Sequence, residues 1–136
     1  MHNGQVGGFE GFRKHADMLI PDDLYAHRKG ATDSEVLFLL LLARGLDDDP
    51  VAAMEVATGE LIGMSKEKGC TPNMRLSAAF SDGQRLWAVR YSTDDVSPSL
   101  YYRFCAKRQG WTVVSEPLEA DEAGWRPMVP VNPFPE

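Results

Sequence analysis

The stretch R-L-S-A-A-F-S-D-G-Q-R-L-W-A-V-R, residues 75–90, decides the fold class of this chain. Apolar side chains alternate with small or polar ones on both sides of Ser81-Asp82-Gly83. Alternation with period two is typical of half-buried strands, and an Asp-Gly pair between two such runs is the strongest short-range signal for a hairpin. Residues 75–90 therefore predict two antiparallel strands joined by a tight turn.

A second hairpin is predicted after the first. Its strands are residues 100–105 and residues 111–114, and a short segment that ends in Gly110 joins them. The C-terminal tail after this second hairpin is expected to be extended with little regular structure, because it holds Pro127, Pro130, Pro133 and Pro135. The second half of the chain is thus predicted to be an antiparallel sheet.

The half before residue 70 has helical periodicity instead. Apolar side chains recur at helical spacing over residues 9–20, which predicts one amphipathic helix that Pro21 interrupts. A leucine-rich run at residues 36–43 predicts a helix buried on most sides and ended by Gly45. Asp49-Pro50 predicts the start of another helix, which runs to about residue 66. Helices followed by antiparallel hairpins indicate an α+β fold.

Composition narrows the classes of function. The 136 residues suit one domain, and 14 Lys+Arg against 20 Asp+Glu give a net charge of −6. This acidic balance argues against nucleic acid or an anionic membrane surface as the partner. Residues 36–43 are too few to span a bilayer and no secretion signal stands at the start, so a cytoplasmic protein is expected. Cys70, Cys105 and the histidines lack ligand spacing, so we predict no metal site.

Two short motifs could carry chemistry. Asn3-Gly4 is either a simple turn or an oxyanion hole, in which a side-chain amide and a backbone N–H converge on a developing negative charge. Thr32-Asp33-Ser34-Glu35 fits a capping box, in which Thr32 and Glu35 each satisfy a free backbone N–H at a helix start. The capping box does not account for Asp33, whose carboxylate is expected to be free to point outward.

These motifs, in their order, resemble the class II glutamine amidotransferases, which are N-terminal-nucleophile hydrolases. The resemblance is strongest to the compact stand-alone branch that includes γ-glutamyl hydrolases of ergothioneine and glutathione metabolism. It rests on His2-Asn3-Gly4-Gln5, Gly30-x-Thr32-Asp33-Ser34-Glu35, Ser81-Asp82-Gly83, Arg90-Tyr91-Ser92, Leu100-Tyr101-Tyr102, Ser115-Glu116-Pro117-Leu118 and Trp125-x-x-Met128-Val129-Pro130. It implies a four-layer αββα sandwich, with helices on both faces of two packed antiparallel sheets.

The resemblance also implies a mechanism. In the family an N-terminal cysteine thiolate attacks the side-chain amide of glutamine, with its own α-amine as the base. Asn3 and Gly4 match the oxyanion-binding residues, and Asp33 matches the acid that binds the substrate's α-ammonium group. Thr32 and His2, from the same two motifs, are counted as substrate-binding residues. The implied partner is glutamine or a γ-glutamyl conjugate, a small molecule, and neither a metal nor a cofactor is expected.

The chain departs from the family pattern at its start. Met1 is followed by His2 rather than by cysteine, and neither Cys70 nor Cys105 can be an N-terminal nucleophile. We therefore expect residues 1–136 to be the C-terminal part of an amidotransferase domain, without the upstream segment that carries the nucleophile and the first strands. Met1 is then either an internal methionine taken for a start or the true start of a truncated gene. The sequence leaves both open.

A partial domain has physical consequences. Missing strands should leave unpaired sheet edges and apolar surface, so poor solubility or self-association through those edges is expected. The chain alone is expected to have negligible amidase activity, because the nucleophile is absent. Two alternatives stay open beside this one. The chain is a non-catalytic module that binds glutamine or glutamate, or it is one half of a split enzyme completed by a separate N-terminal piece.

Overall fold

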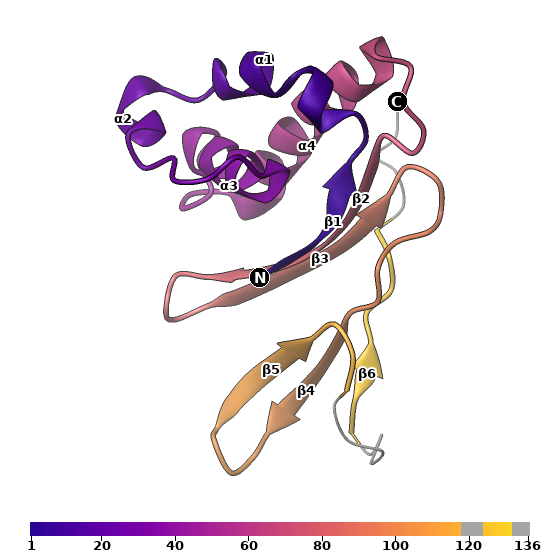
Figure 1. The fold of residues 1–136 in the computed structure, drawn as a ribbon. Coiled ribbons are helices and arrows are strands. Elements are labelled where there is room, and N and C mark those ends of the chain that lie inside the picture. Colours follow the sequence, from indigo (N-terminus) through magenta and orange to yellow (C-terminus); the bar gives the residue numbers. More distant parts are fainter. Residues whose placement is uncertain (118–123, 132–136) are drawn as a thin grey trace. The chain divides into compact units, whose positions relative to one another are not determined.

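The computed structural model describes residues 1–117 and 124–131 (Figure 1). Of the described residues, the first compact unit holds Met1–Gly4, 75–117 and 124–131, and the second holds Gln5–Met74. The elements are β1 (His2–Val6), the 3-10 helix η1 (Phe9–Gly11), α1 (Arg13–Asp17), α2 (Asp22–Tyr25), α3 (Asp33–Ala43), α4 (Pro50–Glu67), β2 (Met74–Ser81), β3 (Leu86–Ser92), β4 (Tyr101–Cys105), β5 (Gly110–Val114) and β6 (Arg126–Pro127). Helices together with two antiparallel sheets confirm the predicted α+β class.

Helix α3 begins and ends at the residues that the sequence indicates. Thr32 is its N-cap, and the Thr32 hydroxyl oxygen accepts a hydrogen bond from the Glu35 N–H at 3.4 Å. Beyond the helix, Gly45 takes the left-handed conformation with φ of 88°. The Leu46 N–H then bonds to the Leu41 carbonyl oxygen at 3.0 Å, which closes the helix end as a Schellman motif.

Helix α4 also follows its sequence signals. The Asp49 carboxylate accepts a hydrogen bond from the Ala52 N–H at 3.1 Å, and Pro50 is the first helical residue. The helix ends at Glu67, one residue beyond the predicted end. Both long helices of the second unit are therefore specified by local signals.

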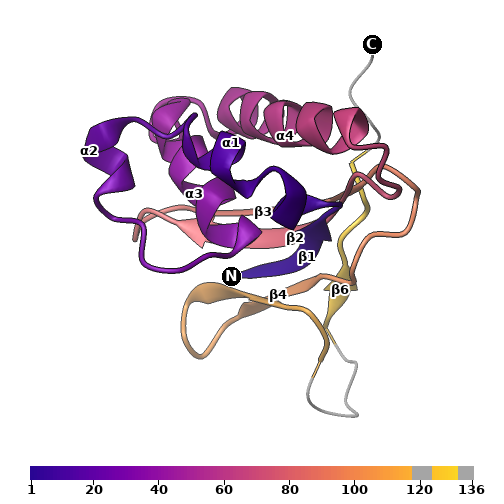
Figure 2. The ribbon, with the colours of Figure 1, turned by 45° about the horizontal axis from the view of Figure 1, so that its top comes forward.

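The core of the second unit lies where α3 packs against α4 (Figures 1 and 2). Val36 and Leu40 on α3 are fully buried, as are Ala53, Ala57 and Leu61 on α4. The three α4 residues are spaced four apart, so they form one stripe along the helix. Two of the three are alanines, which allow close packing of a neighbouring element along this stripe.

The single helix predicted over residues 9–20 is wrong in its continuity. The chain forms η1 and then α1, which are separated at Phe12 by non-helical φ and ψ of −132° and 8°. The rings of Phe9 and Phe12 pack edge to face with centroids 5.7 Å apart, and both side chains are buried. Ala16 and Ile20 are buried as well. The predicted apolar face is therefore correct, although aromatic packing overrides the helical period.

The hairpin of residues 75–90 is confirmed as β2 and β3 in the first unit. The antiparallel register pairs Ala78 with Val89 and Phe80 with Trp87. The two aromatic rings of the second pair stack with centroids 5.6 Å apart. Cross-strand aromatic pairs of this kind stabilise antiparallel sheets and fix their register.

The chain starts with a strand, so the predicted order of helices first is wrong. β1 lies at the edge of a three-stranded sheet in the order β1-β2-β3. The Met1 amino group donates to the Ala79 carbonyl oxygen at 2.8 Å, and the Ala79 N–H donates to the Met1 oxygen at 2.9 Å. This reciprocal pair of bonds is antiparallel pairing. The interpretation of Asn3-Gly4 as a simple turn is also wrong, because both residues are extended within β1.

The second hairpin is confirmed as β4 and β5, and β6 pairs with the other edge of β4. The Arg90 guanidinium connects this region to β3 through bonds to the carbonyl oxygens of Pro98, Ser97 and Met128 at 2.8, 3.1 and 3.0 Å. Pro127 lies in β6, and Pro130 follows it without regular structure, as predicted. Pro133 and Pro135 lie outside the described residues.

The loop between β2 and β3 is expected to be sensitive to acid. The Asp82 carboxylate accepts hydrogen bonds from the backbone N–H groups of Arg85 and Gln84 at 2.7 and 2.9 Å. These donors, helped by the Arg85 guanidinium, lower the pKa of Asp82 from 3.8 to about 2. Because the folded-state pKa is the lower one, the carboxylate stabilises the fold above its unfolded-state pKa. That contribution is lost as the pH falls through about 2.

We expect Asp82→Asn to flatten the dependence of the unfolding free energy on pH between about pH 4 and pH 2. Urea unfolding at a series of pH values measures this slope. The control is Asp47→Asn, which removes an exposed carboxylate between α3 and α4 and should leave the slope as it is. An Asp82→Asn slope equal to that of the wild-type chain would contradict the prediction.

Candidate functional site

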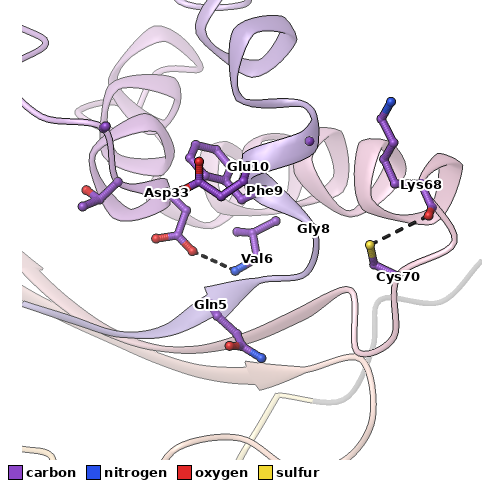
Figure 3. Close-up of a pocket in the computed structure, with 11 residues that line it drawn as sticks. Gln5, Val6, Gly8, Phe9, Glu10, Asp33, Lys68 and Cys70 are labelled. Atoms are coloured by element: carbon purple, nitrogen blue, oxygen red, sulfur yellow. Dashed lines mark hydrogen bonds between the residues drawn. The ribbon is translucent and has the colours of Figure 1, made fainter.

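Asp33, the first residue of α3, holds strand β1 through its carboxylate (Figure 3). Its Oδ2 accepts a hydrogen bond from the Val6 N–H at 2.8 Å, and its Oδ1 accepts one from the Ser34 N–H at 2.8 Å. The Ser34 hydroxyl lies 3.5 Å from the same Oδ1. The expectation that this carboxylate is free is therefore wrong. A carboxylate has about four acceptor positions, so Asp33 can still accept hydrogen bonds from a ligand.

The predicted capping box is formed only in part. The Thr32 hydroxyl caps the Glu35 N–H, but the Glu35 carboxylate turns to the preceding loop. There it accepts hydrogen bonds from the N–H groups of Lys29 at 2.6 Å and Gly30 at 2.7 Å, and from Arg28 at 2.8 Å. These donors, the Lys29 N–H foremost, lower the pKa of Glu35. Glu35 therefore orders the loop that leads into α3.

A pocket of about 820 Å³ lies beside Asp33 within the second unit. Its lining residues are Gln5, Val6, Gly8, Phe9, Glu10, Gly11, Ala31, Thr32, Asp33, Lys68 and Cys70. Figure 3 shows Asp33 directed at Val6 on β1, with Lys68 and Cys70 standing apart from it. The volume lies in the range of small-molecule sites. The pocket brings together Asp33 and Thr32, two of the predicted site residues.

Sequence reasoning missed most of the pocket lining. Lys68 and Cys70 follow the end of α4, and no local motif relates them to Asp33. The Cys70 thiol is free, and its Sγ lies 3.9 Å from the Lys68 carbonyl oxygen. A Cβ on Gly8, which has φ of 69°, would overlap that Sγ. Gly8 therefore allows the chain after β1 to pass close to Cys70.

The other predicted site residues, His2, Asn3 and Gly4, belong to the first unit and do not line this pocket. Asn3 is exposed, so its amide is available to a ligand. Gly4 has φ of 148°, and a Cβ there would overlap the Arg75 carbonyl oxygen of β2. The close approach of β2 and the positive φ thus require glycine at position 4 independently of any role in oxyanion binding. The oxyanion-binding role of Asn3 and Gly4 stays a prediction.

Metal-binding and membrane-spanning features are both absent from the described part of the chain. No group of three His, Cys, Asp or Glu side chains within residues 1–117 and 124–131 could hold a metal ion. Over the same residues, no helix has the length and apolar character needed to cross a membrane.

Comparison with known proteins supports one family. No protein-family model matches the chain, and no curated protein matches it. The solved structure of a glutamine aminotransferase class-II domain protein from Silicibacter pomeroyi is 62% identical in sequence, with a TM-score of 0.90. The match covers 96% of this chain and 58% of that one, so the chain spans less than two thirds of this neighbour's length. This similarity supports the predicted relationship of the chain to the class II glutamine amidotransferase family.

Proposed function

We propose that this chain is part of a class II glutamine amidotransferase domain and binds the glutamate end of a γ-glutamyl amide. The observation that carries the proposal is the Asp33 carboxylate, held by the N–H groups of Val6 and Ser34 at the wall of the 820 Å³ pocket. The 62% identity to the Silicibacter pomeroyi protein supports the family, and the binding role is our inference from this geometry.

Asp33 suits the recognition of an α-ammonium group. Its two backbone donors fix the plane of the carboxylate, so the remaining acceptor positions have a defined direction. Charge-assisted hydrogen bonds from an ammonium group to such a carboxylate are about twice as strong as neutral ones. Thr32 lines the same pocket and keeps Asp33 at the first position of α3 through its cap. A substrate without the ammonium group would lose this recognition.

In the reaction that we propose, a cysteine thiolate outside residues 1–136 attacks the amide carbon of the substrate side chain. Asn3 and the Gly4 N–H stabilise the oxyanion of the tetrahedral intermediate. The carbon–nitrogen bond breaks and leaves a thioester on the cysteine. The α-amine of the cysteine, which took the thiol proton, passes that proton to the departing nitrogen, so ammonia or an amine leaves. Water then hydrolyses the thioester, which releases glutamate and regenerates the thiol. Without that cysteine the chain alone is expected to bind but not to turn over.

The experiment measures glutamate release from L-glutamine and from a γ-glutamyl dipeptide. It compares the 136-residue chain with a longer protein whose reading frame extends upstream to the first in-frame Met-Cys. We expect activity only in the longer protein. There, Asn3→Ala should lower kcat by roughly 10²–10³-fold, the usual contribution of one oxyanion donor.

Gln84→Ala is the matched control for Asn3→Ala, because it removes an exposed side-chain amide in the loop between β2 and β3. It should leave kcat unchanged. Activity in the short chain would contradict the role of an external cysteine. No activity in either protein, with L-glutamate still bound, would favour a non-catalytic binding module.

A further inference from the structure

Arg28 is a cation in the second unit for which neither the sequence motifs nor the proposed mechanism gives a role. Its side chain is 7% exposed, although arginine is seldom buried without partners. The guanidinium Nε donates to Asp17 Oδ1 at 3.1 Å, and Nη1 donates to Glu35 Oε2 at 2.8 Å. Nη1 also lies 3.2 Å from the Thr32 carbonyl oxygen. Arg28 therefore joins the end of α1 to the start of α3.

These contacts enclose the residues that lead into Asp33. Glu35, which Arg28 neutralises, accepts the N–H groups of Lys29 and Gly30. Arg28 itself bonds to Thr32, the N-cap next to Asp33. The backbone of residues 28–32 is thus fixed at both ends by one guanidinium and one carboxylate. Of the residues in this network only Thr32 lines the pocket, whereas Arg28 and Glu35 do not.

We propose that Arg28 is a positioning residue, which holds the start of α3 so that the Asp33 carboxylate meets the Val6 N–H and presents its free acceptor positions. This inference rests on the proposed function for the ligand that Asp33 receives. A planar guanidinium binds two carboxylates and a carbonyl oxygen in fixed directions, which a lysine ammonium cannot reproduce. Arg28→Lys should therefore rescue the site only in part.

The control comes from the other end of the same helix. Arg44 at the end of α3 pairs with Glu60 of α4 at 2.7 Å, and these side chains are 25% and 29% exposed. Arg44→Met breaks an ion pair on α3 far along the chain from Asp33, whereas Arg28→Met breaks the network at its start. Both variants are expected to lose stability. Only Arg28→Met should change the site.

The first measurement is amide hydrogen exchange of the 136-residue chain, read at two neighbouring residues. The Val6 N–H bonds to Asp33, whereas the Gly7 N–H bonds to the Asn73 carbonyl oxygen at 2.8 Å. The ratio of the Val6 protection factor to the Gly7 protection factor reports on the Asp33 contact. A general loss of stability lowers both protection factors alike and leaves this ratio unchanged. We expect Arg28→Met to lower the Val6-to-Gly7 ratio about tenfold, Arg28→Lys less, and Arg44→Met not at all.

The second measurement is the Kd for L-glutamate by calorimetry. Arg28→Met should raise this Kd about tenfold and Arg44→Met less than about twofold. If the Val6-to-Gly7 protection ratio and the Kd for L-glutamate changed by the same amounts in Arg28→Met and Arg44→Met, the positioning role of Arg28 would be overturned. A ratio that falls only in Arg28→Met, while the wild-type chain binds no L-glutamate, would uphold the positioning of Asp33 and overturn the proposed ammonium site instead.

Discussion

Asp33→Asn is expected to weaken the binding of L-glutamate by this chain on the order of 100-fold, which calorimetry measures directly. The substitution removes the negative charge that we propose for the α-ammonium group. It also disturbs the structure, because the two carboxylate oxygens accept from different backbone donors, Val6 and Ser34. An asparagine has one side-chain oxygen, so one of these N–H groups must face an amide NH₂ instead.

The same substitution should therefore reduce the free energy of unfolding by about 1–3 kcal/mol, the usual effect of a buried donor without an acceptor. Asp48→Asn is the matched control, since it removes an exposed carboxylate between α3 and α4 by the same chemical change. It should alter neither affinity nor stability. Unchanged affinity in Asp33→Asn, with the fold intact, would contradict the ammonium-binding role.

The elements that the sequence predicts well are those whose signals lie within a few residues. Thr32 and Gly45 bound α3, Asp49 and Pro50 start α4, and the loop at Asp82 forms the hairpin. Each depends on backbone and side-chain chemistry that is local. β1 escaped prediction because its pairing is not local: Met1 bonds to Ala79. The residues of β1 carry no alternation that would mark a strand.

The site follows the same division. Asp33 is noticeable in the sequence because the capping box does not require an acidic residue at its position. Its hydrogen-bond partner Val6, however, lies 27 residues away and cannot be found from local sequence. Lys68 and Cys70 reach the pocket only because α4 ends beside it. Glu35 has the spacing of a capping-box residue. Its carboxylate nevertheless accepts hydrogen bonds from the N–H groups of Lys29 and Gly30 in the preceding loop instead of from the N-cap N–H. Residue types can be read locally, whereas the partners that position them depend on the fold.

The largest effect on stability is expected from Gly4→Ala. At this position φ is 148°, and an added Cβ would overlap the Arg75 carbonyl oxygen and lie 2.8 Å from the Arg75 carbonyl carbon. Both of these atoms belong to the β2 backbone, which cannot move aside without breaking its own pairing with β3. We expect the unfolding free energy to fall by about 2–4 kcal/mol in urea titrations.

Gly59→Ala is the matched control for this prediction. Gly59 lies exposed within α4, and an added Cβ there would meet nothing within 4 Å, so alanine should stabilise the chain by about 1 kcal/mol through its helix propensity. The two identical substitutions should thus change stability in opposite directions. If Gly4→Ala were as stable as the wild-type chain, β1 would not pair with β2 at this distance. The presence of glycine at position 4 would then be explained by the proposed oxyanion binding alone.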